Sequence, residues 1–425
     1  MKKVLIISYF YPPRPGIGSQ RPYRLSKYLP EFGWGPVVLT AKLPGKAPEA
    51  MRVIETGCGN FIGSLKAGLG LNTGKGLRAQ MGLVSTGPNH SAWKNRANKI
   101  IDEVMHYPDD IKGWYGPAVR AAGELLGRER VDAIISTYYP SASHLIAGEL
   151  KRKFNVPWIA DFRDLWTQNH FYKKSGLIKM LERRLEMKTL ARADAMVTVT
   201  ESFADELGTL HSGKKIFCVT NGYDADEFPA IPAKLTDEFT ITYTGQFYGG
   251  RRDPSPLFEA VARLLRENRI NSELLRIRFC GPAEEWLDAK IKKYGLENVV
   301  RCYGVLPREE ALERQRESQL LLLLLDRDNR EEGVYPAKVF EYLGVRRPII
   351  ALGGTGGLVG DLLAKTRAGR FAGDADILKN MLLEYYGEFE RSGAVACRSN
   401  GNVGDFSYRT VTRQYSDILN GVTGK

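Results

Sequence analysis

Short apolar strands and helices alternate along this chain from its first residues. The β-branched run Val4–Ser8 is followed by a helical pattern over Arg21–Leu29 and by a second apolar run at Pro36–Thr40. This order is a strand–helix–strand unit, the building block of a parallel sheet covered by helices on both faces. It constrains the fold strongly, because helical bundles and antiparallel sandwiches are built from other patterns.

The alternation continues in two separate series. Further strands of the first series are predicted at Val131–Ser136, Pro157–Asp161, Ala195–Thr200 and Ile216–Thr220, with a helix over Ser141–Phe154. Strands of the second series are predicted at Phe239–Thr244, Arg276–Cys280, Val299–Tyr303, Leu320–Leu325 and Pro348–Leu352. Helices between these strands are predicted at Pro256–Arg266, Ala283–Tyr294, Arg308–Arg316 and Ala337–Gly344. The polar stretch Asp224–Glu238 joins the series, so 425 residues suffice for two Rossmann-like α/β domains.

Composition excludes several classes of protein. The chain is 43% hydrophobic and 26% charged, which is typical of a globular protein. Its five cysteines are scattered without a C-x-x-C pair, and its five histidines show no H-x-x-x-H spacing, so we expect no metal site. No apolar run approaches the ~20 residues that span a bilayer. These features favour a cytoplasmic protein, with peripheral membrane contact left open.

Charge is the unusual feature of the composition. Lys and Arg number 61 against 49 Asp and Glu, and residues 1–120 hold 17 of the cations but only seven of the acids. The stretch Cys58–Ile101 has six cations, interspersed apolar residues and no acid at all. We interpret it as an inserted segment that suits an anionic membrane surface, with a plain surface loop as the alternative. No nucleic-acid-binding motif accompanies the charge, so nucleic acid is not an expected partner.

Two loops of the first series are candidate ligand sites. Gly16 and Gly18 follow the first strand, where glycine lets backbone amides approach an anion. The dinucleotide fingerprint G-x-G-x-x-G is not met, and a plain strand–helix turn is the alternative. Asp161, Arg163 and Asp164 stand at the end of a later strand, the usual ligand-facing edge of such a sheet. They could instead form an ion pair that caps a helix.

The second series has three such loops. Gly245 opens a segment that includes Arg251 and Arg252, and arginine pairs well with a diphosphate. Tyr335 and Pro336 precede a helix whose first turn has free amides and a positive dipole end. Lys338 and Glu341 lie on that helix, where the carboxylate suits a ribose diol. A third loop, Gly353–Gly357, is glycine-rich and could also contact a phosphate or a sugar.

Taken together, these segments resemble glycosyltransferase family four, whose members have the GT-B fold. The resemblance rests in the first half on SYFYPPRPGIGSQRPYRLSKYL, VPWIADFRDLW and VTNGYDADEF. In the second half it rests on ITYTGQFYGGRRDPSPLFEA, RIRFCGPAEE and YPAKVFEYLGVRRPIIALGG. It implies two Rossmann-like domains facing each other across a cleft. By this likeness residues 1–228 form an acceptor domain with a basic insertion at about 56–106, and residues 229–400 a donor domain. Residues 401–425 then form a helix that packs back toward the first domain.

The resemblance also implies a function. The family suggests a retaining, metal-independent, hexosyltransferase-like enzyme that needs no cofactor and uses a nucleotide-diphosphate sugar as donor. The acceptor expected here is a lipid-linked saccharide, or another saccharide, in surface polysaccharide or glycan assembly. The alternatives are a sugar-nucleotide-binding protein without catalysis and a GT-B epimerase.

Residue roles follow from the same likeness. Donor-binding positions are Gly16, Gly18, Gly245, Arg251, Arg252, Glu332, Tyr335, Lys338 and Glu341, and acceptor-side catalytic candidates are Asp161, Arg163, Asp164 and His144. The sequence departs from the family in two places. Gly333 stands where an E-x7-E pattern would have its first carboxylate, and Phe247 stands where the family often has arginine. Glu331 or Glu332 could take over the role of the missing carboxylate.

Overall fold

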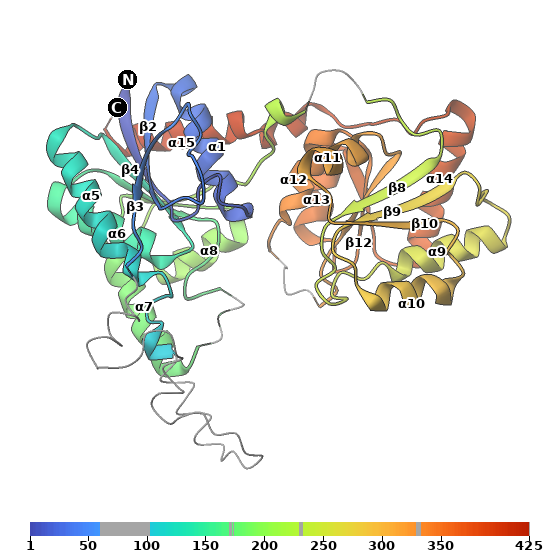
Figure 1. Ribbon diagram of the computed structural model, residues 1–425, viewed down its shortest axis with the longest axis horizontal. Helices are drawn as coiled ribbons and strands as arrows, with labels where there is room; N and C mark the ends of the chain where they lie inside the picture. The colour runs from blue at the N-terminus through green and yellow to red at the C-terminus, as the bar shows by residue number, and fades with distance from the viewer. Residues whose placement is uncertain (60–102, 170–171, 173, 229–232, 329–332, 425) are drawn as a thin grey trace, which may run out of the picture. The chain divides into compact units, whose positions relative to one another are not determined.

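The computed structural model describes residues 1–59, 103–169, 172, 174–228, 233–328 and 333–424 (Figure 1). The chain divides into two compact units. The first is Met1–Thr220 together with Thr412–Lys425, and the second is Asn221–Val411. The sequence predicted the boundary between the domains after residue 228, and the structure divides the chain after Thr220. Most of the predicted basic insertion at about 56–106 lies outside the described residues.

The first unit is built on a seven-stranded parallel sheet. Its strand order is β3-β2-β1-β4-β5-β6-β7. The strands are β1 (Lys2–Ile7), β2 (Trp34–Ala41), β3 (Arg52–Thr56), β4 (Ala133–Tyr138), β5 (Trp158–Phe162), β6 (Ala195–Thr198) and β7 (Ile216–Cys218). The central strand β1 pairs on one side with β2 and on the other with β4. Because the chain reverses its direction of growth across the sheet there, the β1–β4 boundary is the position at which ligands usually bind.

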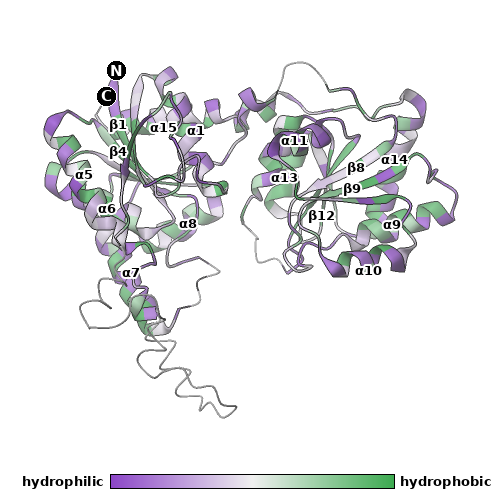
Figure 2. Ribbon diagram, viewed as in Figure 1, coloured by the Kyte–Doolittle hydropathy of each residue, from purple (hydrophilic) through white to green (hydrophobic). Residues whose placement is uncertain are grey.

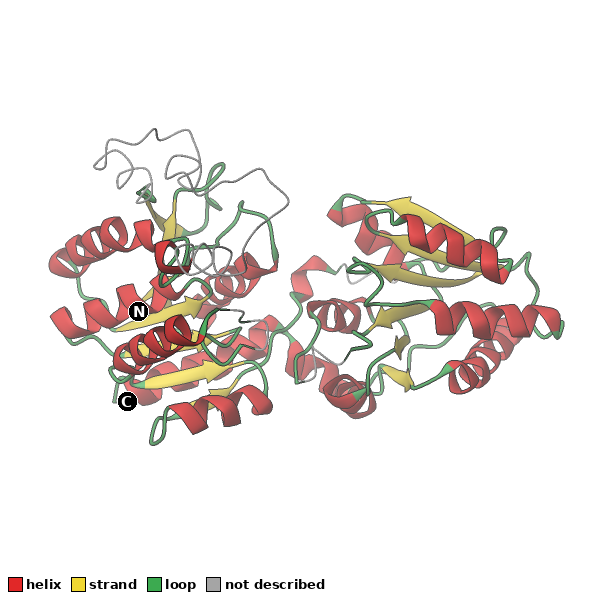
Figure 3. Ribbon diagram, turned by 90° about the horizontal axis from the view of Figure 1, so that it is seen from below, coloured by secondary structure: helices red, strands yellow, loops and turns green. Residues whose placement is uncertain are grey.

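Helices lie on both sides of this sheet (Figure 3). They are α1 (Gln20–Tyr28), α5 (Tyr115–Arg128), α6 (Ser141–Phe154), α7 (Gly176–Leu190), α8 (Glu201–Leu210) and α15 (Tyr408–Val422). Local signals set their ends. The Thr200 hydroxyl accepts a hydrogen bond from the Phe203 amide at 3.3 Å and caps α8. Helix α6 ends at Asn155, whose φ of 52° is a left-handed conformation that asparagine tolerates.

The second unit has a six-stranded parallel sheet in the order β10-β9-β8-β11-β12-β13. The strands are β8 (Phe239–Thr244), β9 (Leu275–Cys280), β10 (Val300–Gly304), β11 (Leu320–Leu324), β12 (Ile349–Leu352) and β13 (Gly369–Ala372). The helices are α9 (Ser255–Arg266), α10 (Glu285–Tyr294), α11 (Arg308–Arg316), α12 (Ala337–Val345), α13 (Gly357–Thr366) and α14 (Ala375–Ser392). The reversal of strand order falls between β8 and β11.

The leucine run at β11 shows why this sheet is buried on both faces. Leu320, Leu322 and Leu324 enter one hydrophobic core, while Leu321 and Leu323 enter the core on the opposite face. Successive side chains of a strand point to opposite faces, so a strand covered on both sides must be apolar throughout. Figure 2 shows hydrophobic residues in both the helices and the strands of each unit. The prediction of two Rossmann-like α/β domains is confirmed. Within the described residues, no helix combines the length and apolar character needed to cross a membrane.

Candidate functional site

The first unit has a pocket of about 430 Å³ at the carboxyl ends of its central strands. Loops after β1, β4 and β5 line it, which places it at the reversal of strand order. Its lining residues are Phe10, Pro15, Gly16, Gly18, Tyr138, Tyr139, Arg163, Asp164 and Asn169. The structure therefore brings together four of the residues that the sequence singled out, namely Gly16, Gly18, Arg163 and Asp164.

Arg163 is held firmly against the floor of this pocket. Its Nε donates to the Tyr138 carbonyl at 2.8 Å, and its Nη2 donates to the Tyr139 carbonyl at 3.3 Å. Its guanidinium also lies 5.7 Å from the ring centre of Phe10. A side-chain carbon at Gly18 would overlap that guanidinium, so position 18 needs glycine for Arg163 to lie where it does. The pocket thus presents a fixed cation beside a glycine loop.

Asp164 gives the same pocket a carboxylate. Its side chain is 54% exposed, and one of its oxygens lies 3.8 Å from Arg163 Nε. Desolvation raises the pKa of the Asp164 carboxyl, Arg163 lowers it, and the neighbouring Asp161 raises it further, with a net upward shift. A carboxyl group with a raised pKa is better suited to proton transfer than an ordinary aspartate.

Asp161 does not face this pocket, because it is completely buried in the first unit. Its oxygens accept hydrogen bonds from Arg21 Nε at 3.2 Å and from the Tyr415 hydroxyl at 2.5 Å. Arg21 also donates to the carbonyls of Val219 and Thr220, both at 2.8 Å. These contacts favour a structural role for Asp161 over the predicted catalytic one. Its carboxylate ties α1 and β5 to the end of the chain.

His144 is also buried, with no accessible surface. Its Nδ1 is hydrogen-bonded to the Ser136 hydroxyl at 2.7 Å, and its ring packs 4.7 Å from that of Phe162. Burial lowers the pKa of His144 to about 3, so the ring is neutral in the folded protein. Buried among aromatic rings, His144 does not line the pocket, and this setting favours a structural role over the predicted catalytic one.

The second unit has a small pocket of about 40 Å³ at the carboxyl ends of β11 and β12. Asp326 after β11, the glycine loop Gly354–Gly357 after β12, and Gly333 and Pro336 before α12 line it. Among the described residues, no side chain caps the first turn of α12. The positive end of the helix dipole lies at Pro336, which lines the pocket, and suits an anion there.

Glu341 lies one turn along α12 at the centre of a cluster of basic and amide groups. Its Oε1 accepts from Lys338 Nζ and from Gln315 Nε2, both at 2.7 Å, and its Oε2 accepts from Arg308 Nη1 at 3.0 Å. Burial raises the pKa of the Glu341 carboxyl, but Lys338, Gln315 and Arg308 outweigh it, so the net shift is downward. Glu341 is thus held ionised and oriented, as a hydroxyl-binding carboxylate must be.

The arginine pair after β8 separates into two environments. Arg251 is partly exposed, and its Nη1 lies 3.4 Å from a carboxylate oxygen of the buried Asp326. Arg252 is 9% exposed, with its guanidinium 4.7 Å from the ring centre of Tyr248. Arg251 is therefore the better placed of the two to reach a ligand. Phe247, which replaces the arginine frequent in the resembling family, is buried in the core.

Three other predicted donor-side residues have different surroundings. Gly245 follows β8 directly and donates its amide to the Cys280 carbonyl at 2.9 Å. Tyr335 lies just before α12, and its ring packs 5.5 Å from Phe340. Glu332 lies outside the described residues, so its predicted role stays a prediction. Gly333, next to it, has a φ of 82°, a left-handed conformation in which a glutamate would be strained.

The sequence did not single out several residues of these sites. Arg308 and Gln315 reach Glu341 from α11, where they look like ordinary polar residues of a surface helix. Asp326 follows the leucine run, and its position at a strand's carboxyl end was the one signal that could have indicated it. Within the parts of the chain that the structure describes, no three His, Cys, Asp or Glu side chains are grouped to hold a metal ion.

Known proteins show the same architecture. Residues 18–222 match the glycosyl transferase 4-like domain family. Sucrose-phosphate synthase from Thermosynechococcus elongatus is similar over 100% of both chains, with a TM-score of 0.61 and 13% identity. HepE from Anabaena, solved in complex with UDP, is similar over 99% of this chain and 100% of its own, with a TM-score of 0.62 and 13% identity.

A third similar structure is the lipopolysaccharide outer core galactosyltransferase WaaB. It covers 99% of each chain with a TM-score of 0.56 and 13% identity. No curated protein matches the sequence. At these identities the solved structures show the fold, which is GT-B, and the family match covers most of the first unit.

Proposed function

We propose that this chain, whose residues 18–222 match the glycosyl transferase 4-like domain family and whose fold is GT-B, transfers a sugar from a nucleoside-diphosphate sugar to an acceptor. The observation that carries the proposal is the setting of Glu341. The ionised carboxylate on α12 is linked through Gln315 to Thr244 at the carboxyl end of β8, and Lys338 lies one turn before it on the same helix. A carboxylate suits the two hydroxyls of a ribose, and the positive groups suit the phosphates that follow it.

The chemistry on the donor side is stabilisation of a leaving group. Departure of a nucleoside diphosphate leaves negative charge on phosphate oxygens, and fixed positive groups are the usual means of lowering that barrier. Lys338, Arg251 and the first-turn amides of α12 supply such groups on the second unit. We propose on this basis that transfer proceeds without a metal ion and that Gly245 lets the backbone approach the donor.

The acceptor is proposed to bind in the pocket of the first unit. Arg163 offers a fixed cation there, and Asp164 offers a carboxyl group with a raised pKa that can exchange a proton with an acceptor hydroxyl. Gly16 and Gly18, which the family likeness assigns to the donor, line the same pocket, and Gly18 leaves space there for the Arg163 guanidinium. The retaining stereochemistry of the proposed reaction rests on the family likeness.

The proposed acceptor is a lipid-linked saccharide at a membrane surface, in the assembly of a surface polysaccharide or glycan. The support is the charge of residues 1–120 and the acid-free composition of 58–101, which suit an anionic lipid surface or a diphosphate-linked acceptor. WaaB, a galactosyltransferase of the lipopolysaccharide outer core, has the same fold, and HepE binds UDP. We therefore propose a uridine nucleotide as the first donor to test.

A sugar-nucleotide-binding protein without catalysis is the second candidate function. Gly333 favours it, because a left-handed backbone at that position is unsuited to the glutamate that the family's pattern would place there. Such a protein would bind the nucleotide through Glu341 and release none of it from a sugar donor.

Release of the nucleoside diphosphate separates the two candidates. The purified chain is incubated with UDP-sugars and a membrane extract as the source of acceptor, and free UDP is measured. A transferase releases UDP only when the extract is present, and Glu341→Ala abolishes the release. Glu309→Ala, which removes an exposed acid at the start of the neighbouring helix α11, is the matched control and keeps full activity. Binding of UDP without release supports the second candidate.

A further inference from the structure

The outward side of α7 is unusual for a surface helix. Nine of its residues are exposed, and apart from Gly176 at its start they are of only two kinds. The apolar ones are between 38% and 60% exposed, and the others are all cations. The apolar set is Leu177, Met180, Leu181 and Met187, and the basic set is Lys179, Arg183, Arg184 and Lys188. We call these eight residues the outer face of α7.

The two kinds of residue are ordered along the helix. Leu177, Met180 and Leu181 follow the spacing i, i+3 and i+4, so their side chains form one continuous apolar stripe. Arg184 and Lys188 continue the same side by one and two further turns, and Figure 2 shows both hydrophobic and hydrophilic residues along α7. A surface helix normally turns its apolar stripe into the core. Here Ile178, Thr189 and Leu190 face inward instead, so the outer stripe is an additional one.

The acids of the helix are turned away from this face. Glu182 is 1% exposed and bonds to Tyr172 and Lys174, while Glu186 is fully buried and accepts a hydrogen bond from the Thr167 amide at 3.1 Å. The outer face therefore has four positive charges and no negative one. Burying two carboxylates beneath a helix that exposes four cations gives a strongly one-sided charge distribution.

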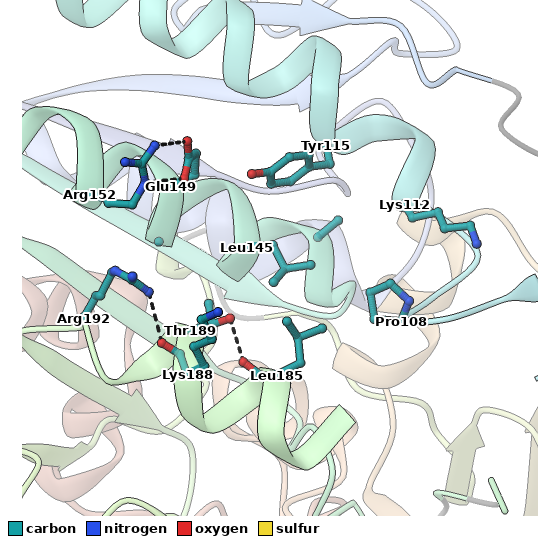
Figure 4. Close-up of a pocket in the computed structure, with 12 residues that line it drawn as sticks. Pro108, Lys112, Tyr115, Leu145, Glu149, Arg152, Leu185, Lys188, Thr189 and Arg192 are labelled. Carbon is teal, nitrogen blue, oxygen red and sulfur yellow. Dashed lines mark hydrogen bonds and ion pairs between the residues drawn. The ribbon is translucent and has the colours of Figure 1, made fainter. Parts of the chain in front are cut away.

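A groove beside α7 extends the basic surface. It lies between α5, α6 and α7 and has a volume of about 490 Å³ (Figure 4). Its polar side has four cations, Lys112, Arg152, Lys188 and Arg192, and one acid, Glu149, which is ion-paired with Arg152. Apolar residues, among them Leu145 and Leu185, line the rest. Lys188 belongs both to the groove and to the outer face of α7, so the two surfaces are continuous.

We propose that the outer face of α7 docks on the surface of an anionic membrane, with the apolar stripe inserted among the headgroups and the cations against lipid phosphates. Apolar and basic side chains together on one side of a helix suit that interface, where apolar burial and attraction to anionic lipid add together. A second copy of the chain fits poorly, since two such faces would bring four cations against four. The inference rests on the proposed function in one respect: it identifies the surface that brings the enzyme to a lipid-linked acceptor.

Sedimentation with lipid vesicles tests the docking. The full chain is mixed with vesicles of phosphatidylcholine and phosphatidylglycerol, and the bound fraction is compared with that on phosphatidylcholine alone. Arg183→Gln with Arg184→Gln removes two cations and is expected to weaken binding about thirtyfold, because each cation near an anionic surface contributes a factor of about five. Leu177→Gln with Met180→Gln is expected to weaken it about tenfold or more. Both pairs are exposed, so the fold tolerates them.

Matched controls and a second readout keep the test decisive. Lys292→Gln with Lys293→Gln on α10, and Ile377→Gln on α14, change equally exposed cations and an equally exposed apolar residue and should leave vesicle binding unchanged. Stabilisation by UDP, measured on the same variants, reports on the donor site and should remain as in the unchanged chain. If UDP does not stabilise the wild-type chain, the proposed function is refuted, while the result on vesicle binding still holds.

Two outcomes would overturn the inference. In the first, the α7 variants bind anionic vesicles as well as the controls do. In the second, the variants alter sedimentation velocity, and hence the oligomeric state, without altering vesicle binding. That result would assign the face to contact between copies of this chain.

Discussion

Replacing Asp161 by asparagine tests whether this residue is structural or catalytic. The side chain keeps its shape and loses its charge, which leaves the Arg21 guanidinium buried without its carboxylate. Arg21 is 2% and Asp161 is 0% exposed, so water cannot take the place of the lost partner. The Tyr415 hydroxyl, which donates to Asp161 at 2.5 Å, also loses an ionised acceptor.

The expected magnitude follows from this burial. Removing one member of a buried ion pair typically costs about 3–5 kcal/mol, since the remaining charge is uncompensated. In a unit of this size each kcal/mol lowers the melting temperature by about 2–4 °C, so a decrease of about 6–20 °C is expected. Arg21→Met combined with Asp161→Leu removes both charges and should recover most of the loss, because the apolar pair leaves no buried charge.

Differential scanning calorimetry of the wild-type chain, Asp161→Asn and the double variant measures the change in melting temperature. The UDP-release assay measures activity at a temperature below the melting transition of Asp161→Asn. A structural Asp161 predicts a large loss of stability with transfer retained at low temperature. Unchanged melting of Asp161→Asn together with complete loss of transfer would refute the reasoning and restore Asp161 to the catalytic group.

Four further predictions concern the two sites and the buried His144. Gly18→Val should displace the Arg163 guanidinium and lower acceptor-dependent turnover about a hundredfold without changing stabilisation by UDP, as paired activity and thermal-shift assays would show. Glu341→Gln should weaken UDP binding measured by calorimetry by about 1.5–3 kcal/mol. In the wild-type chain, UDP binding should persist from about pH 8 to pH 5 and be lost only in stronger acid. The reason is that the pKa of Glu341 is lowered, so its charge disappears only as pH falls through that lowered value. His144 has a pKa of about 3 in the fold, so the stability present above its ordinary value of 6.5 should decline as pH falls from 6.5 toward 3; His144→Gln should flatten that part of the denaturation profile.

Much of the fold could be predicted because buried parallel strands have a strong local signature. Each strand inferred from an apolar run is present within a few residues of its predicted bounds, and the run at Leu320–Leu325 is the central strand β11. The elements that were missed have weak signatures. β3 (Arg52–Thr56) is an edge strand with mostly exposed or half-exposed residues, and β13 (Gly369–Ala372) is a four-residue edge strand. Pairing with a neighbour, not composition, makes these segments strands.

The candidate sites could be predicted only in part. Strand order alone brings Gly16, Gly18, Arg163 and Asp164 to one edge of the sheet, and this follows from topology. Whether a residue at such an edge faces a ligand depends on what covers it. Tyr415, 254 residues away along the chain, covers Asp161, and no local pattern indicates that contact.

The donor site shows the same limit. Glu341 and Lys338 are one turn apart on a single helix, so their proximity could be expected from the sequence. Arg308 and Gln315 approach from another helix, and their position depends on how α11 packs against α12.

Stabilisation of the folded chain by nucleotides tests the central claim most directly. Thermal unfolding is recorded with UDP, GDP, ADP and TDP and with sugars linked to each of these nucleotides. A donor site predicts that at least one nucleotide at about a hundred times its dissociation constant adds about 2.7 kcal/mol of stability, a shift of several degrees. Glu341→Ala should remove that shift and Glu309→Ala should preserve it. No shift with any nucleotide, or an equal shift in both variants, would contradict the assignment of the donor site to the surroundings of Glu341 on α12.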